Sequence, residues 1–206
     1  MKKSLKVLKT IYEKNFLKYG YDYKTVGWNK NSALKRHEVM TELFLKDKKK
    51  KTILDFGCGL SHYFLYLKKN KIKNYTYIGL DISEKMIEKS KSLYPNNLYI
   101  CADILEDKTK LPKFDYAVLN GLFTQKLNYS DKVMLVFLKN VTKKIFNLSH
   151  KGIAFNLLAP FPDWKNKKNF YPSLDVILKF ITLNLSKNIV INHNYKLFEY
   201  TIYVYK

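Results

Sequence analysis

Cysteine is scarce in this chain of 206 residues, which contains only Cys58 and Cys101. Two cysteines do not supply the disulfide framework of a small secreted domain, so we expect both to be reduced, semi-buried residues of a cytoplasmic protein. No stretch approaches the run of about 20 apolar residues that spans a bilayer. The start of the chain leads into an amphipathic pattern instead of the apolar core of a signal peptide. We therefore expect no membrane span.

Arginine and acidic residues are also scarce. The chain has 38 lysines and arginines against 17 acids, a net charge of +21, and Arg36 is the only arginine. Dense positive charge suits nucleic-acid phosphates, but proteins that bind nucleic acid usually employ the planar guanidinium as well. Lysine spread over every segment favours a compositional bias over an RNA-binding stripe, which remains the alternative. A positively charged surface would help to attract a small anionic substrate under either interpretation.

The most informative stretch, residues 52–61, is an apolar run that ends on an acid and breaks into a glycine turn. Asp55 precedes Gly57 and Gly59 there. Strand, glycine turn and helix form a nucleotide-type cleft at the carboxyl end of the first strand of a doubly wound α/β sheet. Glycines let the backbone approach a ligand closely and take positive φ. The stretch therefore predicts a cofactor loop.

Two residues of this loop discriminate between cofactors. A dinucleotide fingerprint requires a third glycine at the position of His62. The carboxylate of Asp55 would repel a pyrophosphate but attract a cationic amino or sulfonium group. The charge pattern therefore favours a cationic ligand.

Asp55, Gly57 and Gly59 resemble the first motif of class I S-adenosylmethionine-dependent methyltransferases, an acid followed by G-x-G-x-G. Ser61 stands at the third glycine position, where we expect its side chain to cap the following helix. The resemblance implies S-adenosyl-L-methionine as cofactor, with S-adenosyl-L-homocysteine as product, and no metal.

The resemblance extends over residues 51–206, which we expect to form the methyltransferase domain behind an N-terminal helical cap of residues 1–50. It implies an α/β, Rossmann-like, doubly wound sheet of seven strands, mostly parallel, with an antiparallel C-terminal hairpin strand. The expected strands are 52–56, 75–81, 98–105, 114–121, 152–158, 188–192 and 198–205.

Two further acids end the next predicted strands. Asp81 follows Gly59 by 22 residues, near the separation of about 20 at which an acid reaches ribose hydroxyls. In the family that the chain resembles, the acid after the third strand accepts a hydrogen bond from the adenine amino group, and Asp103 occupies that position. We expect both acids to converge with Asp55 at one rim of the sheet. The residues expected to bind the cofactor are Trp28, Arg36, Asp55, Gly57, Cys58, Gly59, Asp81, Ile82, Met86, Ala102, Asp103, Ile104, Asn120 and Gly121.

The single arginine lies on the apolar face of a helix that we expect from about Ser32. An inward arginine in a lysine-rich chain indicates a need for bidentate geometry. Arg36 is therefore expected to hold the methionyl carboxylate of the cofactor or an anionic acceptor, unless it forms a structural ion pair with Glu38 or Glu42.

The segment after the fourth strand, residues 120–123, reads Asn-Gly-Leu-Phe. Some base-modifying relatives carry Asn-Pro-Pro-Tyr there to bind a planar amine, so the missing prolines argue against adenine or a glutamine amide as acceptor. We expect Phe123, Thr124 and Gln125 to line an acceptor pocket. The loop over residues 160–172 is expected to act as a lid on the acceptor side.

Methyl transfer from a sulfonium is an in-line displacement, so the protein mainly aligns donor and acceptor and excludes water. A neutral hydroxyl acceptor also needs a base, for which His193, Asp163 and His62 are the candidates. An acceptor that is already anionic needs none.

A second resemblance concerns the acceptor. The chain looks like small methyltransferases of bacterial surface-polysaccharide assembly in two places. These are Gly27-Trp28 with Arg36, ahead of the glycine loop, and residues 120–124, after the fourth strand. We therefore expect O-methylation of a small anionic or saccharide acceptor in capsule or surface-polysaccharide biosynthesis. The alternatives are an RNA methyltransferase and a non-catalytic partner subunit that binds an adenosyl ligand.

Overall fold

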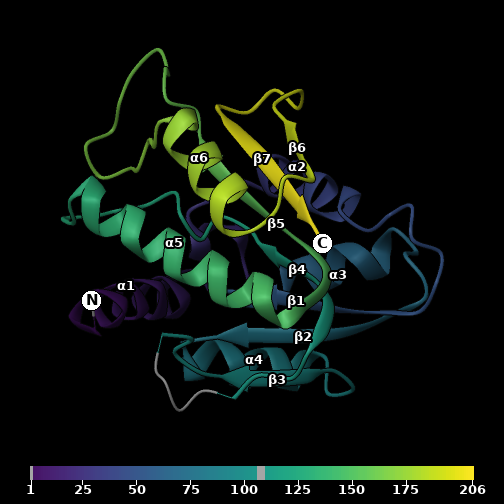
Figure 1. Ribbon diagram of the computed structural model, residues 1–206. Coiled ribbons are helices and arrows are strands. Elements are labelled where there is room, and N and C mark those ends of the chain that lie inside the picture. Colours follow the sequence, from purple (N-terminus) through teal and green to yellow (C-terminus); the bar gives the residue numbers. More distant parts are fainter. Residues whose placement is uncertain (1, 106–109) are drawn as a thin grey trace.

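The computed structural model describes residues 2–105 and 110–206, with side chains from Val7 onward (Figure 1). Its centre is one seven-stranded sheet in the order β3-β2-β1-β4-β5-β7-β6. The strands are β1 Lys51–Phe56, β2 Tyr75–Asp81, β3 Leu98–Cys101, β4 Phe114–Leu119, β5 Ser149–Leu158, β6 Ile189–Asn192 and β7 Glu199–Tyr205.

Strands β1 to β5 pair in parallel, and β7 lies antiparallel between β5 and β6. This order confirms the expected doubly wound sheet with a C-terminal hairpin. The helices are α1 Lys2–Tyr19, α2 Lys30–Glu42, α3 His62–Lys69, α4 Glu84–Leu93, α5 Asp131–Leu148 and α6 Leu174–Asn184, with a short 3-10 helix η1 at Tyr23–Val26.

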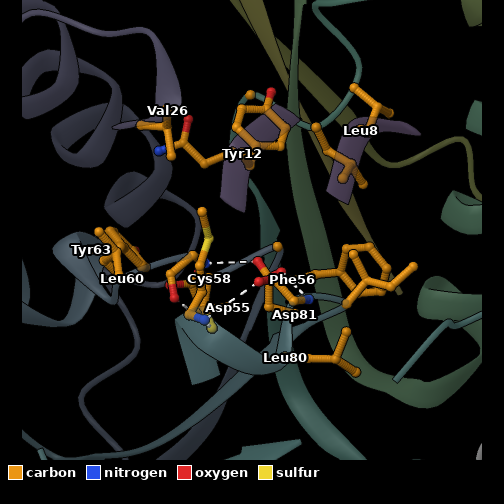
Figure 2. A pocket seen from close by; sticks show the side chains of 18 of the residues that line it. Leu8, Tyr12, Val26, Asp55, Phe56, Cys58, Leu60, Tyr63, Leu80 and Asp81 are labelled. Carbon is orange, nitrogen blue, oxygen red and sulfur yellow. Dashed lines mark hydrogen bonds between the residues drawn. The ribbon is translucent and has the colours of Figure 1, made fainter. Parts of the chain in front are cut away.

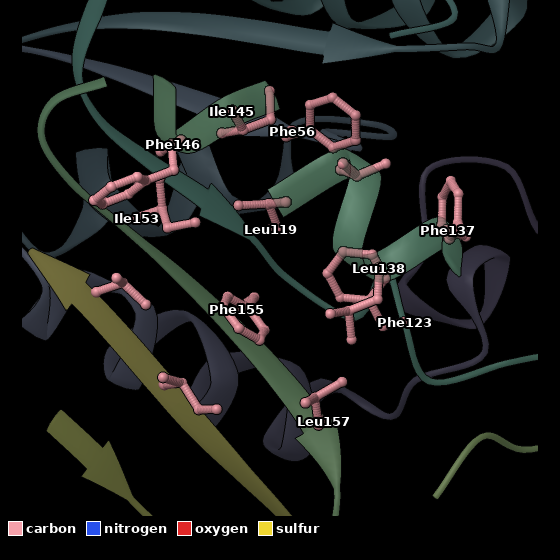
Figure 3. Close-up of a cluster of buried hydrophobic side chains, with 14 of the residues drawn as sticks. Phe56, Leu119, Phe123, Phe137, Leu138, Ile145, Phe146, Ile153, Phe155 and Leu157 are labelled. Atoms are coloured by element: carbon pink, nitrogen blue, oxygen red, sulfur yellow. The ribbon is translucent and has the colours of Figure 1, made fainter. Parts of the chain in front are cut away.

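Helices cover both faces of the sheet. The apolar residues of α5 and α6 pack on one face, and those of α2, α3 and α4 pack on the other. Figure 3 shows Phe137, Leu138 and Ile145 of α5 over Phe155 and Leu157 of β5. Buried strands of this kind are apolar on both faces, which explains the near-continuous apolar runs of the sequence.

Ser83 and Ser130 cap α4 and α5, because their hydroxyls accept bonds from the backbone N–H of Met86 and Val133. Each such cap satisfies a backbone donor that has no partner within the helix.

The third strand is shorter than expected. It ends at Cys101, after which the N–H of Ala102 donates one more backbone bond to the carbonyl of Asp81. The side chain of Asp103 then accepts a bond from the N–H of Leu105, and the chain turns there. Cys101 is exposed and not semi-buried as expected, because β3 is an edge strand. Cys58 is buried, and both cysteines are free thiols.

In the part of the chain that the structure describes, no helix combines the length and apolar character that crossing a membrane requires.

Candidate functional site

A cavity lies at the carboxyl ends of β1, β2 and β4, where a doubly wound sheet binds its ligands. Thirteen of the fourteen residues expected to bind the cofactor line it, and the exception is Arg36. Figure 2 shows Asp55, Cys58 and Asp81 on the sheet side of this cavity, with Leu8 and Tyr12 of α1 across from them.

The glycine loop takes the backbone conformation that the sequence predicts. Gly57 and Gly59 have φ values of 76° and 51°, which favour a residue without Cβ. The backbone N–H groups of Gly57 and Cys58 donate to the carbonyl of Leu80 at 2.7 and 2.9 Å, and Gly59 donates to Asp81 at 2.9 Å. The loop is thereby fixed to the end of β2 at three points.

Ser61 does not cap α3 as expected. Its φ of 59° is the left-handed conformation that a third glycine would take, and its side chain makes no capping bond. The hydroxyl instead donates to the Tyr99 hydroxyl at 3.2 Å. Ser61 therefore takes over the backbone role of the missing glycine.

Asp55 is buried at the base of the cavity, with 3% of its surface exposed. Burial raises the pKa of its carboxyl group to about 7; the charge of Asp81 adds to this increase, and the hydrogen bond from Tyr77 opposes it. A cation entering the cavity would favour the ionised carboxylate and reverse this shift. The site is therefore suited to a positively charged ligand.

Asp81 accepts backbone bonds on both carboxylate oxygens, from Gly59 at 2.9 Å and from Ser83 at 2.8 Å. Burial raises its pKa, against the lowering effect of these bonds. Each oxygen keeps a further lone pair that a ligand hydroxyl can use. Asp103 lines the same cavity, so the structure brings the three acids to one rim.

Helix α1 supplies a wall of the cavity that the sequence did not indicate. Leu8, Lys9 and Tyr12 line it. Burial and the charge of Asp81 raise the pKa of Tyr12 to about 12. A 2.8 Å bond from the Ser83 hydroxyl to Glu13 ties the helix to the segment after β2. The helical stripe of the sequence predicted a helix here, but no local signal placed it at the site.

His37 of α2 is a second cavity residue that sequence reasoning missed. Its side chain is 3% exposed, and Nδ1 lies 3.1 Å from Nδ2 of Asn120 at the end of β4. Burial, with the charges of His62 and Arg36, lowers the pKa of His37 to about 3, so the ring is neutral at pH 7. Its Nε2 and the Oδ1 of Asn120 have no hydrogen-bond partner among the described residues. Unpaired buried polar atoms of this kind mark a candidate ligand contact.

Two of the three candidate bases lie outside the cavity. Asp163 is exposed in the loop after β5, and His193 is exposed in the β6–β7 turn, where it bonds the carbonyl of Glu199 at 2.8 Å. His193 follows β6, which β5 and β7 separate from β4 in the sheet order. His62 lines the cavity, but it packs between Tyr21 and Tyr23, and burial lowers its pKa to about 4.

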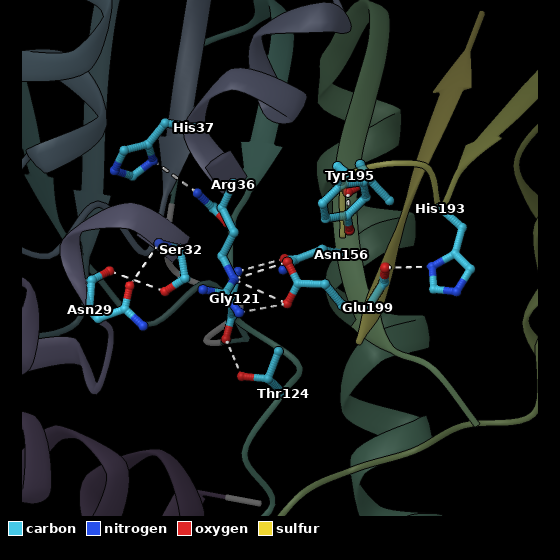
Figure 4. A network of polar contacts seen from close by, with 12 residues as sticks. Asn29, Ser32, Arg36, His37, Gly121, Thr124, Asn156, His193, Tyr195 and Glu199 are labelled. Carbon is cyan, nitrogen blue, oxygen red and sulfur yellow. Dashed lines mark hydrogen bonds and ion pairs between the residues drawn. The ribbon is translucent and has the colours of Figure 1, made fainter. Parts of the chain in front are cut away.

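Arg36 does not line the cavity and forms an ion pair with Glu199. Its Nε and Nη2 donate to Oε2 of Glu199 at 3.0 and 2.9 Å, and Nε also lies 2.9 Å from Oε1 (Figure 4). The guanidinium lies 4.8 Å from the centre of the Trp28 ring. Glu199 is 1% exposed. The acid that pairs with Arg36 is therefore Glu199 of β7, and not Glu38 or Glu42 as the sequence suggested.

Two of the three residues expected to line the acceptor pocket do line the cavity. Thr124 and Gln125 line the cavity, whereas Phe123 is fully buried against Phe137 and Phe155. No residue of the loop over 160–172 lines the cavity, although its end is bonded to the cavity segment: Phe170 donates to the carbonyl of Thr124 at 2.9 Å.

These residues fit an adenosyl sulfonium ligand. The buried Asp55 complements its positive charge and the half-buried Asp81 complements its ribose. A Cβ added at Gly59 would come no nearer than 3.8 Å to another residue, so the turn is not crowded. Among the described side chains, no group of three or more His, Cys, Asp or Glu is placed to hold a metal ion.

Comparisons with known proteins agree with this geometry. A family model described as a methyltransferase domain matches residues 47–195. Rv1506c of Mycobacterium tuberculosis, provisionally named a methyltransferase, is 26% identical over 94 residues, which are 45% of this chain and 57% of that protein. The match therefore spans little more than half the length of this relative.

Solved structures share the fold over nearly the whole chain. The N-methyltransferase NodS from Bradyrhizobium japonicum, in complex with S-adenosyl-L-homocysteine, has a TM-score of 0.66 at 13% identity and covers 95% of this chain and 96% of its own. Magnesium protoporphyrin IX methyltransferase from Synechocystis, with bound S-adenosylmethionine, has a TM-score of 0.64 at 14% identity and covers 96% of each chain. At these identities the likeness concerns the fold alone.

Proposed function

Because the chain belongs to the methyltransferase domain family and is an S-adenosylmethionine-dependent enzyme, we propose that it methylates a hydroxyl oxygen of a small saccharide or anionic acceptor. The proposed setting is the cytoplasm, during assembly of a capsule or other surface polysaccharide. The motif resemblance at residues 120–124 supports the setting, and the net charge of +21 suits the gathering of an anionic acceptor.

The cofactor supplies a methyl group on a sulfonium centre. The chain's own residues bind and orient it in this proposal: Asp55 provides the opposite charge, Asp81 accepts bonds from the ribose hydroxyls, and Asp103 accepts a bond from the adenine amino group. Gly57 and Gly59 keep the turn free of side chains, so the backbone lies close to the ligand.

The observation that carries the choice of acceptor is the His37–Asn120 pair. If the Asn120 amide nitrogen donates to Nδ1, the neutral ring carries its proton on Nε2, and Asn120 keeps a free oxygen. If the amide is turned over, Nε2 is a free acceptor and the amide nitrogen is a free donor. In both arrangements the pair offers one donor and one acceptor to a ligand.

One donor and one acceptor complement a hydroxyl group. Its oxygen accepts one bond and donates one, and it still keeps a lone pair for attack on the methyl group. A neutral amine that accepts a bond has used the only lone pair it could attack with. The two unpaired atoms are shielded from water, so we expect the rings around His37 to shift slightly when the acceptor enters. The pair therefore favours oxygen over nitrogen.

Transfer of a tritiated methyl group tests this proposal. The protein is incubated with labelled S-adenosylmethionine and, in parallel, with nucleotide sugars, phosphorylated oligosaccharides and RNA, and the products are identified by mass spectrometry. We expect an O-methyl group on a saccharide. Label confined to RNA or to an amine nitrogen contradicts the proposal, as does donor binding without label in any saccharide pool.

Substitutions separate acceptor binding from donor binding. We expect His37→Phe to lower kcat/KM about 100-fold with little change in the affinity for S-adenosylhomocysteine, whereas His37→Gln, whose amide still donates and accepts, should lose less. His193→Phe is the control and should keep full activity. Asp81→Ala should lose calorimetric binding of S-adenosylhomocysteine.

A further inference from the structure

The loop after β5 exposes two aromatic side chains to water. Phe161 is 92% exposed and Trp164 is 71% exposed, although aromatic rings usually bury most of their surface. Pro160 and Pro162 flank Phe161 and restrict the backbone there. Figure 1 shows this loop, in green ahead of α6, projecting from the body of the protein. Two exposed rings three residues apart indicate a contact surface.

Positive charge accompanies these rings. Lys165, Lys167 and Lys168 are exposed, and none forms an ion pair with a residue that the structure describes. Asp163 is the only acid of the loop. We call residues 161–168 the aromatic–lysine loop.

The β6–β7 turn lies beside the base of this loop. Ala159, at the start of the loop after β5, donates a 3.0 Å backbone bond to the carbonyl of Phe198. Phe198 is 65% exposed, and Lys196 beside it is exposed as well. The combination of rings and lysines therefore occurs in two neighbouring segments.

This surface adjoins the acceptor side of the cavity. The backbone N–H of Lys126 donates to the carbonyl of Lys168 at 2.8 Å, and Asn169 forms a β-bridge with Gln125. Gln125 lines the cavity. A partner bound to the aromatic–lysine loop would therefore lie close to the cavity wall that Gln125 forms.

We propose that the aromatic–lysine loop docks the protein on the surface of an anionic lipid bilayer. Trp and Phe insert at the interface between lipid headgroups and acyl chains, while lysines pair with anionic headgroups. Single-stranded RNA is the alternative ligand, because its bases could stack on the aromatic rings and its phosphates could pair with the lysines. The lysines complement an anionic headgroup layer, and the exposed Phe161 and Trp164 are the kind of rings that insert beneath it, so we commit to the bilayer.

Vesicle sedimentation of the full chain tests the proposal without reference to methyl transfer. We expect binding to vesicles of phosphatidylglycerol mixed with phosphatidylcholine, and little binding to phosphatidylcholine alone. The double variant Phe161→Ala, Trp164→Ala should lower the partition coefficient about tenfold or more, because two large apolar side chains no longer insert. Changing Lys165, Lys167 and Lys168 to Gln should lower it to a similar extent.

A matched control removes the same charge elsewhere. Lys68, Lys69 and Lys71 at the end of α3 are also exposed, and changing them to Gln should leave binding nearly unchanged. Equal losses in the two lysine triples, or no preference for anionic vesicles, would overturn the proposal. The proposal would also be overturned if an RNA oligonucleotide bound the protein through Trp164 and displaced it from the vesicles. Unchanged melting temperatures would show that each variant is folded.

Discussion

The hydroxyl of Tyr77 donates a 2.6 Å hydrogen bond to the carboxyl group of Asp55, and the two side chains are only 2% and 3% exposed. This bond stabilises the ionised form of Asp55, whereas burial favours the protonated form. Burial has the larger effect, and the pKa of Asp55 is raised from 3.8 to about 7. The charge state of the cofactor loop therefore changes close to neutral pH.

The affinity for S-adenosylmethionine should fall as the pH drops below about 7. Protonation removes the negative charge that faces the sulfonium, so the dissociation constant should rise by up to about tenfold per pH unit. Tyr77→Phe removes a bond to the ionised form and should move the midpoint to higher pH. Asp55→Asn should bind weakly and show no midpoint. Calorimetric titrations between pH 5.5 and 8.5 would measure this, and a flat profile for the unaltered chain would contradict it.

Gly121→Ala should disturb both stability and donor binding. Gly121 has φ of +73°, and an added Cβ would lie 2.4 Å from Cζ2 of Trp28. Gly20→Ala is the matched control, since Gly20 has φ of +61° but no neighbour within 4 Å. We expect Gly121→Ala to lose about 1–3 kcal/mol more free energy of unfolding than the control. Equal losses in denaturant titrations would show that Trp28 does not restrict this position.

Breaking the Arg36–Glu199 pair should affect stability more than donor affinity. The side chains are 14% and 1% exposed, so Arg36→Met leaves a buried carboxylate without its partner and should cost about 3–5 kcal/mol. The double variant with Glu199→Met should recover much of this loss. Lys35→Met, at the exposed pair with Glu38, should change little. A large loss of S-adenosylmethionine affinity in a folded Arg36 variant would instead support a contact with the cofactor.

Ser61→Gly should be more stable than Ser61→Ala by about 1 kcal/mol. Both variants lose the hydrogen bond to Tyr99, so their difference isolates the strain of the left-handed backbone at this position. Chemical denaturation of the two proteins measures it. Equal midpoints would mean that the loop relaxes around alanine.

The sequence was informative wherever the signal is local. Asp55 and the two glycines lie within five residues of one another, and the parallel topology then brings Asp81 to the same edge of the sheet. The partners of Arg36 and His37 had no such signal. Glu199 is 163 residues from Arg36, and Asn120 is 83 residues from His37, so these pairs depend on the complete packing of the chain.

The candidate bases show that the sequence can also suggest site residues that the fold places elsewhere. Their residue types suit proton transfer, but the type of a residue does not determine its place in the sheet. His193 follows β6, which β5 and β7 separate from β4, and Asp163 lies in the exposed loop after β5; neither residue lines the cavity. His37 showed no distinguishing pattern along the chain, and only its burial beside Asn120 marks it.

Helix α1 lies entirely before residue 47, where the family match begins, and yet Leu8, Lys9 and Tyr12 form part of the cavity wall. The stretch that matches the family model therefore does not enclose the cavity by itself. A version that starts at residue 47 should keep the sheet, as judged by circular dichroism, but bind S-adenosylmethionine weakly, because one side of its pocket is left open to water. Substitutions in this leading helix would then change how long the cofactor is retained while leaving the sheet itself intact.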